Sequence, residues 1–133
     1  MNEEQLRGLL AQPRFHRFLE MRLIEADAAA RRLRIALPFK SDYCLFDPPG
    51  NLHGGIIASL ADVAGTFACM MVAGKPTPTI NLRVDYLAAP PRPELTATAT
   101  VLPGGASVLA ARIEVAAADG TLVASACGNW LSR

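Results

Sequence analysis

The chain has 133 residues, a length that predicts one domain over residues 1–133. Its formal net charge is +1, which excludes the strongly basic surface that attracts nucleic acid or an anionic membrane. Hydrophobic residues make up 51% of the chain and charged residues only 19%, so we expect a large buried surface around a helix or between subunits.

The cysteines and histidines show no pattern typical of a metal site. Cys44, Cys69 and Cys127 are odd in number and include no C-x-x-C pair, which indicates reduced thiols in a reducing compartment. His16 and His53 lie far apart in the sequence, so we expect no metal and no other cofactor. The first residues are acidic and lack the apolar core of a signal peptide, and we therefore expect a cytoplasmic protein without a membrane partner.

The predicted elements are a short helix, two strands, a loop, a long helix and four strands. Residues 2–12 form an amphipathic helix that Pro13 ends. Alternating apolar and polar residues predict strands at Phe18–Asp27 and Arg31–Leu37. Prolines and glycine make residues 40–51 a loop, and a long helix runs from near Gly54 to near Ala73. Turn-like separators delimit the last four strands, at Thr79–Leu87, Glu94–Leu102, Ser107–Ala117 and Thr121–Leu131.

This order of elements predicts the fold class. Strands that follow one another across short turns form an antiparallel sheet. The single long helix must bury its apolar face against that sheet. The prediction is an α+β fold in which an antiparallel sheet packs against one long helix, with Trp130 at a sheet edge or an interface.

Two stripes of side chains run along the long helix. Large apolar residues recur at spacings of four and three, and small residues cover most of the remaining surface, as in a buried helix. Ser59, Asp62 and Thr66 form a second, polar stripe. Asp62 is the only ionisable residue between His53 and Lys75, and a carboxylate on a buried helix is costly unless it has a function. The alternatives are a structural hydrogen bond, to Thr66 or to backbone, and a position facing solvent.

The residues before the helix are suited to binding negative charge. His53, Gly54 and Gly55 precede its first turn, and glycine allows backbone to approach a ligand closely. The first N–H groups of a helix have no partner within it and carry partial positive charge. They can hold a developing oxyanion, although Gly-Gly before a helix also serves close packing alone.

Two segments resemble the hotdog-fold thioesterases. The run from Gly50 to Asp62, GNLHGGIIASLAD, and the strand TINLRVDYL from Thr79 to Leu87, followed by Pro90, are similar to those of the PaaI-like group. This group includes the phenylacetate-degradation thioesterases and the human thioesterase superfamily member 2 type. The resemblance implies a hotdog fold, hydrolysis of an acyl-CoA substrate, and active sites between the subunits of a homodimer. Such dimers usually pair again into homotetramers.

The resemblance also implies roles for individual residues. Asp62 matches the catalytic acid, either as the nucleophile or as the general base for water. The Gly54 N–H matches the group that polarises the thioester carbonyl, and Gly55 lies beside it in the substrate site. His53 fixes the loop. Thr66 and Thr79 match hydroxyl groups that orient the water or the carboxylate.

One position departs from the family pattern. The family usually has Asn or Gln six residues before the histidine, and here that residue is Asp47. Asp47 either occupies the amide position among the catalytic residues or points away in a shifted loop, and Asn51 is an alternative source of the amide.

The residues that would hold CoA are less well defined. Arg83 is a candidate for the phosphates, with Arg92, Arg112 and Arg133, although an ordinary surface charge is the commoner role of an arginine. The turn at Gly104 and Gly105 lacks the basic residue that the family often has there, and its glycines offer room for the pantetheine arm.

Three other functions compete with thioester hydrolysis. A hotdog hydratase or dehydratase would use a catalytic histidine, whereas His53 lies in the Gly-Gly context. A non-catalytic acyl-CoA-binding protein of the same fold would explain Asp47. A structural dimerisation domain would not need the polar stripe on the helix.

Overall fold

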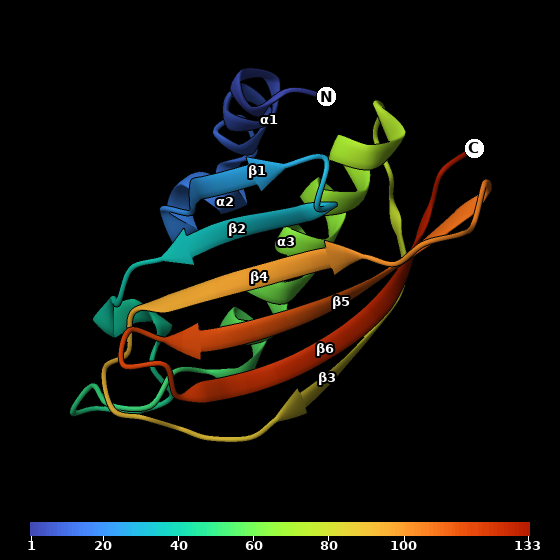
Figure 1. Ribbon diagram of the computed structural model, residues 1–133. Coiled ribbons are helices and arrows are strands. Elements are labelled where there is room, and N and C mark those ends of the chain that lie inside the picture. The colour runs from blue at the N-terminus through green and yellow to red at the C-terminus, as the bar shows by residue number, and fades with distance from the viewer.

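The structure is a computed structural model that describes all residues from Met1 to Arg133. One antiparallel sheet of six strands curves around the long helix α3 (Gly54–Ala73), as Figure 1 shows. The strand order is β1-β2-β4-β5-β6-β3, so β1 and β3 are the edge strands. This arrangement confirms the predicted α+β hotdog architecture. The strands are β1 (Arg22–Asp27), β2 (Arg32–Leu37), β3 (Thr79–Tyr86), β4 (Leu95–Val101), β5 (Val108–Ala117) and β6 (Leu122–Leu131).

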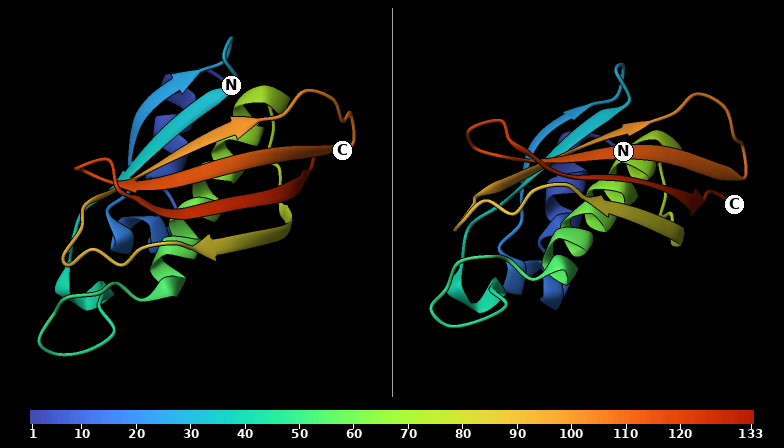
Figure 2. Two further views of the ribbon diagram at one scale, coloured as in Figure 1. Left: turned by 60° about the horizontal axis from the view of Figure 1, so that its bottom comes forward. Right: turned by 90° about the horizontal axis from the view of Figure 1, so that it is seen from below.

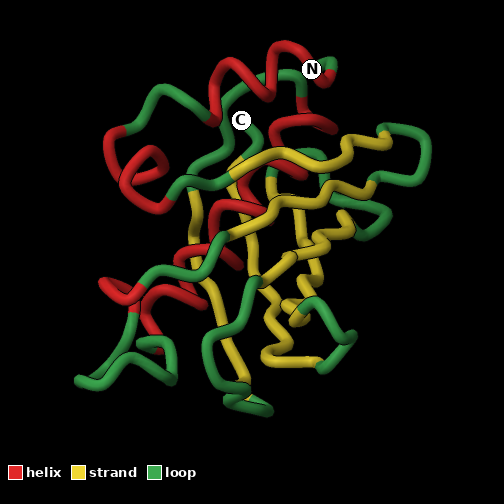
Figure 3. The backbone as a smooth tube through the Cα atoms, turned by 90° about the vertical axis from the view of Figure 1, so that its left-hand side faces the viewer, coloured by secondary structure: helices red, strands yellow, loops and turns green.

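Helix α3 lies across the concave face of the sheet (Figure 2). Seen from the side, the helices gather on one face of the molecule and the strands on the other (Figure 3). By length and composition α3 resembles a membrane-spanning helix, but most of it is buried inside the fold, as in the core helix of a globular protein. It begins at the N-cap His53 and ends at Gly74, which adopts the left-handed conformation (φ 73°) common at helix C-termini.

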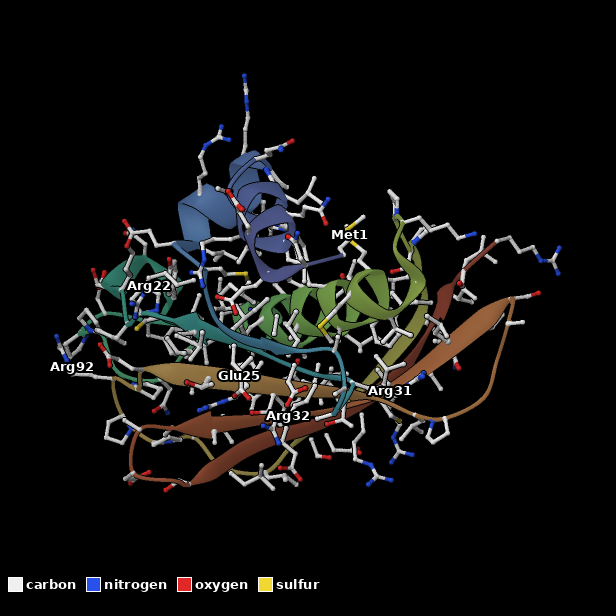
Figure 4. The ribbon with its side chains drawn as sticks, turned by 45° about the horizontal axis from the view of Figure 1, so that its top comes forward. Met1, Arg22, Glu25, Arg31, Arg32 and Arg92 are labelled. Carbon is white, nitrogen blue, oxygen red and sulfur yellow. The ribbon has the colours of Figure 1, made fainter.

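The N-terminal segment covers the remaining part of the core. Helix α1 (Glu3–Leu10) begins with a capping box between Asn2 and Gln5, which satisfies two backbone N–H groups. The N-terminal ammonium of Met1 donates a hydrogen bond to the Met71 carbonyl at 3.0 Å, and Figure 4 shows Met1 above α3. The segment is thereby attached to the end of α3 that lies away from His53.

The outer face of the sheet near β1 and β2 is charged. Arg32 and Glu25, labelled in Figure 4, form an ion pair of 2.7 Å across the two strands. The Arg32 hydrogen bond holds the pKa of the Glu25 carboxyl below its usual value. Both side chains are partly exposed, so we expect the pair to contribute little to stability.

The predicted strand at Phe18–Asp27 is wrong in its first part. Residues Arg14–Leu19 form the short helix α2, and β1 begins only at Arg22. Glu20 ends α2 in the left-handed conformation (φ 53°), which is uncommon for a residue other than glycine. The predicted loop at residues 40–51 also contains one 3-10 turn, Ser41–Tyr43.

Candidate functional site

One backbone N–H at the start of α3 has no partner within the chain. The Nδ1 atom of His53 accepts a hydrogen bond from the Gly55 N–H at 2.9 Å. The Ile56 N–H bonds to the His53 carbonyl at 3.0 Å. The Gly54 N–H makes no such bond. It therefore remains available for a ligand oxygen, at the partially positive end of the helix.

Tyr86 holds this helix start against β3. Its hydroxyl donates a hydrogen bond to the Gly54 carbonyl at 2.8 Å. A Cβ atom at Gly54 would lie 3.2 Å from the Tyr86 ring, so glycine allows the close approach of helix and ring. The sequence pattern assigned no role to Tyr86, although this residue lies in the strand Thr79–Leu87 that resembles the family.

The Asp62 carboxylate faces β3. Its Oδ1 atom accepts a hydrogen bond from the Thr79 hydroxyl at 2.7 Å. The carboxylate forms no ion pair, and its residue is half-buried in the single chain rather than fully buried. The structure thus places a carboxylate without a neutralising cation beside a hydroxyl donor, an arrangement suited to a base or a nucleophile.

A chain of hydrogen bonds continues behind Asp62. The Thr79 and Thr66 hydroxyl oxygens lie 3.3 Å apart. The Trp130 indole N–H donates to the Thr66 hydroxyl at 2.8 Å, and the buried Thr77 hydroxyl donates to the Thr66 carbonyl at 3.2 Å. The structure therefore brings together three predicted site residues, Asp62, Thr66 and Thr79.

An irregularity in β3 directs Thr79 towards Asp62. Thr79 pairs with Trp130 and Asn81 pairs with Asn129, so Ile80 is an extra residue, a β-bulge. Without it, the alternation that places Leu82 and Val84 against the core would turn Thr79 to the opposite face. The bulge is thus what makes the Thr79–Asp62 hydrogen bond possible.

Trp130 is not at a sheet edge or an interface, contrary to the prediction from its position near the chain end. Strand β6 lies between β5 and β3, and the Trp130 side chain is completely buried. A Cβ atom on Gly65 would overlap its ring, and one on Gly128 would lie 2.9 Å from it. Two glycines therefore form the slot that admits the indole.

Ser59, the third member of the polar stripe, does not join this site. Its hydroxyl donates to the Gly55 carbonyl at 2.7 Å, within its own helix. Cys69 is also excluded as a nucleophile, because burial raises the pKa of its thiol to about 12.

The side chains of the other predicted site residues form no hydrogen bond with the start of α3 or with Asp62, Thr66 and Thr79. Asp47 and Asn51 are exposed, and neither side chain forms a hydrogen bond within the chain. Arg83 is exposed and pairs with Asp85 at 3.2 Å. Gly104 and Gly105 lie between β4 and β5 with positive φ angles, and a Cβ at Gly105 would overlap the Val108 carbonyl. The turn itself thus requires glycine at this position.

Within one chain, the free N–H and the carboxylate are far apart. Gly54 and Asp62 are eight residues apart on α3, which corresponds to about 12 Å along the helix axis. One reacting carbonyl group cannot contact both within hydrogen-bond distance. A small apolar hollow of about 100 Å³ lies beside Gly54, lined among others by Leu52, Ile57 and Tyr86.

Two proteins are similar in sequence to part of this chain. A protein of Saccharolobus solfataricus named "Putative esterase SSO2140" is 31% identical over 86% of this chain and 79% of its own length. The Escherichia coli "Medium/long-chain acyl-CoA thioesterase YigI" is 34% identical over 60% of this chain. That match spans only 61% of the length of YigI.

Solved structures share the fold along nearly the whole chain. The X-ray structure of a thioesterase superfamily protein has a TM-score of 0.90 and 29% identity, and covers 98% of this chain and 97% of its own. The Escherichia coli PaaI protein, from the phenylacetic acid degradation operon, has a TM-score of 0.86. It is 22% identical over 98% of this chain and 91% of its own, which supports the fold alone.

The family itself follows from the sequence match. Residues 49–124, more than half of the chain, match the family described as the Thioesterase superfamily. This segment includes the start of α3, Asp62, Thr66 and Thr79. The chain therefore belongs to the thioesterase superfamily and has its hotdog fold.

Proposed function

We propose that this protein hydrolyses acyl-CoA or aroyl-CoA thioesters to free acid and CoA. The observation that carries the proposal is the Asp62 carboxylate, which Thr79 orients at 2.7 Å and no cation neutralises. The name of YigI, an acyl-CoA thioesterase for medium and long chains, supports a CoA ester as the substrate. The apolar hollow beside Gly54 offers a surface for an acyl or pantetheine chain.

In the proposed reaction, Asp62 activates the attack on the thioester carbonyl. As a general base it takes a proton from water, whose oxygen forms the new bond to the carbonyl carbon. The Gly54 N–H stabilises the negative charge that develops on the carbonyl oxygen. The C–S bond then breaks, and the CoA thiolate leaves and takes up a proton. As a nucleophile, Asp62 would form an acyl-aspartyl anhydride that water hydrolyses in a second step.

The same geometry supports an active site built by two copies of the chain. The carbonyl group needs both Asp62 and a free N–H, and these lie about 12 Å apart within one helix. A two-fold axis that places Gly54 beside the partner's Asp62 also places Asp62 beside the partner's Gly54. Such an axis passes near residue 58, where Ala58 is small and partly exposed.

Strand β3 offers the surface for this pairing. It is an edge strand of eight residues that pairs only with β6, and most of its residues are exposed. Ile80 and Tyr86 expose 52% and 53% of their surface. Long exposed edge strands are templates for pairing with another chain. We therefore propose a homodimer that joins two sheets at β3, with two active sites, and a further pairing of dimers.

The state of His53 weighs against the hydratase alternative. Its Nδ1 atom already accepts the Gly55 hydrogen bond and caps α3. This hydrogen bond occupies Nδ1 and leaves only Nε2 for proton exchange with an enoyl substrate. A hydratase would also convert an enoyl-CoA without releasing free thiol, so the two activities give different products.

A panel of acyl-CoA and aroyl-CoA esters, assayed for thiol release, tests the proposed function. We expect at least one ester to be hydrolysed by the wild type. Asp62→Asn keeps the size of the side chain but removes the base, so we expect it to fold, to bind the ester and to release no thiol. Wild-type turnover in Asp62→Asn would contradict the mechanism. Binding of esters without hydrolysis by the wild type would instead indicate an acyl-CoA-binding protein.

A further inference from the structure

We propose that Trp130 is a positioning residue that holds the Asp62 carboxylate in its reactive orientation through two threonine hydroxyls. This inference rests on the proposed function, because it gives the orientation of Asp62 a purpose. It concerns a side chain that touches no substrate: Trp130 is completely buried and bonds only to Thr66 by its side chain.

The donor chemistry fixes the direction of every bond in this chain. An indole N–H can only donate, so the Thr66 hydroxyl oxygen accepts from Trp130. An ionised carboxylate can only accept, so the Thr79 hydroxyl proton is directed to Asp62. The remaining contact, 3.3 Å between the two hydroxyl oxygens, is then a bond from Thr66 to Thr79. All donors therefore face towards Asp62.

Without the indole, the Thr66 hydroxyl would have more rotational freedom. A threonine hydroxyl rotates freely and can donate to the carbonyl one turn back in its own helix. If Thr66 turned in that way, Thr79 would lose its donor and would be free to direct its own proton elsewhere. The Trp130 donor occupies one lone pair of the Thr66 oxygen and so restricts the directions that the Thr66 proton can take, and hydrogen bonds in such a chain strengthen one another.

The indole itself has little freedom to move. The glycine slot closes around it, since a Cβ on Gly65 would overlap the ring. Trp130 and Thr79 are also paired across β6 and β3, so the first donor and the last hydroxyl share one rigid strand pair. The bulge at Ile80 places Thr79 on the same face as the indole.

As a consequence, the two carboxylate oxygens of Asp62 have different roles. Oδ1 is held by Thr79, while Oδ2 has no hydrogen bond within the chain. We infer that Oδ2 acts on water or the thioester, and that its direction is set by the bond at Oδ1. A small misplacement of a catalytic group lowers the rate of the chemical step more than it weakens substrate binding.

Kinetics of Trp130→Phe test this inference. Phenylalanine keeps an aromatic ring in the slot and removes only the donor and part of the ring. We expect kcat to fall about ten- to hundredfold while KM stays near the wild-type value. The control is Ile113→Val, which also opens space beside Gly65 but removes no hydrogen-bonding group. Its kcat should be unchanged.

Equal kcat values in Trp130→Phe, Ile113→Val and wild type would overturn the inference while leaving the proposed hydrolysis intact. Absence of hydrolysis in the wild type would contradict the proposed function instead. The two failures are therefore distinguishable.

A second measurement does not depend on activity or on the folding of Trp130→Phe. Trp130 is the only tryptophan, so its indole N–H gives a single, assigned peak in a ¹H–¹⁵N NMR spectrum. We expect Thr66→Val, Thr79→Val and Asp62→Asn each to shift this peak by more than Ile113→Val does. An indole peak that responds to Ile113→Val but not to Thr79→Val or Asp62→Asn would show that Trp130 is only a packing residue.

Discussion

The imidazole of His53 leaves one particular N–H free at the start of α3. It accepts from the Gly55 N–H, and the Ile56 N–H is also bonded, whereas the Gly54 N–H has no partner within the chain. The residue pattern His-Gly-Gly predicted that this segment would bind negative charge. The pattern alone did not single out the Gly54 N–H, which the family resemblance implied, because the bonding of the neighbouring N–H groups depends on the rotamer of His53.

Replacing Gly54 by proline tests this donor. Proline removes the N–H but is well tolerated at the first position of a helix. We expect hydrolysis to fall about 10²- to 10³-fold, as on loss of one oxyanion donor elsewhere. Gly54→Ala is the matched control, because it keeps the N–H and adds only a Cβ near the Tyr86 ring. Equal losses in the two variants would mean that space beside Tyr86, and not the donor, matters.

At the scale of elements, α3 and β6 meet at a contact that requires glycine. Gly65→Ala should destabilise the protein by about 1–3 kcal/mol, because overpacking against Trp130 outweighs the better helix propensity of alanine. Gly8→Ala is the matched control on α1, where a Cβ meets no atom within 4 Å. It should stabilise the protein by about 0.5–1 kcal/mol. Urea denaturation measures the free energy of unfolding of both variants. If both substitutions changed it in the same direction, the claim that the contact between Gly65 and Trp130 requires glycine would be contradicted.

The sequence pattern predicted the elements with regular periodicity and missed those without it. The long helix, the last four strands and the strand at Arg32–Leu37 lie where the alternation and turn residues placed them. Helix α2 was missed because its six residues are too few to show a helical period and Pro13 provides no side-chain cap. Its end at Glu20 has positive φ without the glycine that usually marks such a position.

The candidate site was predictable only in part, for a related reason. Asp62 and Thr79 lie in the two segments that resemble a known family, and Thr66 lies one turn after Asp62 on α3. The structure joins the three residues by hydrogen bonds. The bulge at Ile80 and the burial of Trp130 depend on the pairing of β3 with β6. That register is a property of the folded sheet, and no local pattern encodes it.

For the whole molecule, the central claim is that Asp62 of one chain acts together with the Gly54 N–H of another. The separation of about 12 Å within a single α3 leads to this claim. The exposed edge strand β3 provides the surface on which two chains can meet. The claim can be tested without knowing how the dimer is packed, because a shared site permits complementation between two inactive variants.

The most direct test mixes Asp62→Asn with Gly54→Pro, by unfolding and refolding the two proteins together at equal concentration. Each variant alone should be nearly inactive in the thiol-release assay. Half of all dimers in the refolded mixture should be heterodimers. Each heterodimer should contain one intact site that combines Asp62 from one chain with Gly54 from the other. We therefore predict recovery of about a quarter of wild-type turnover. A refolded mixture no more active than the separate variants would contradict the shared site.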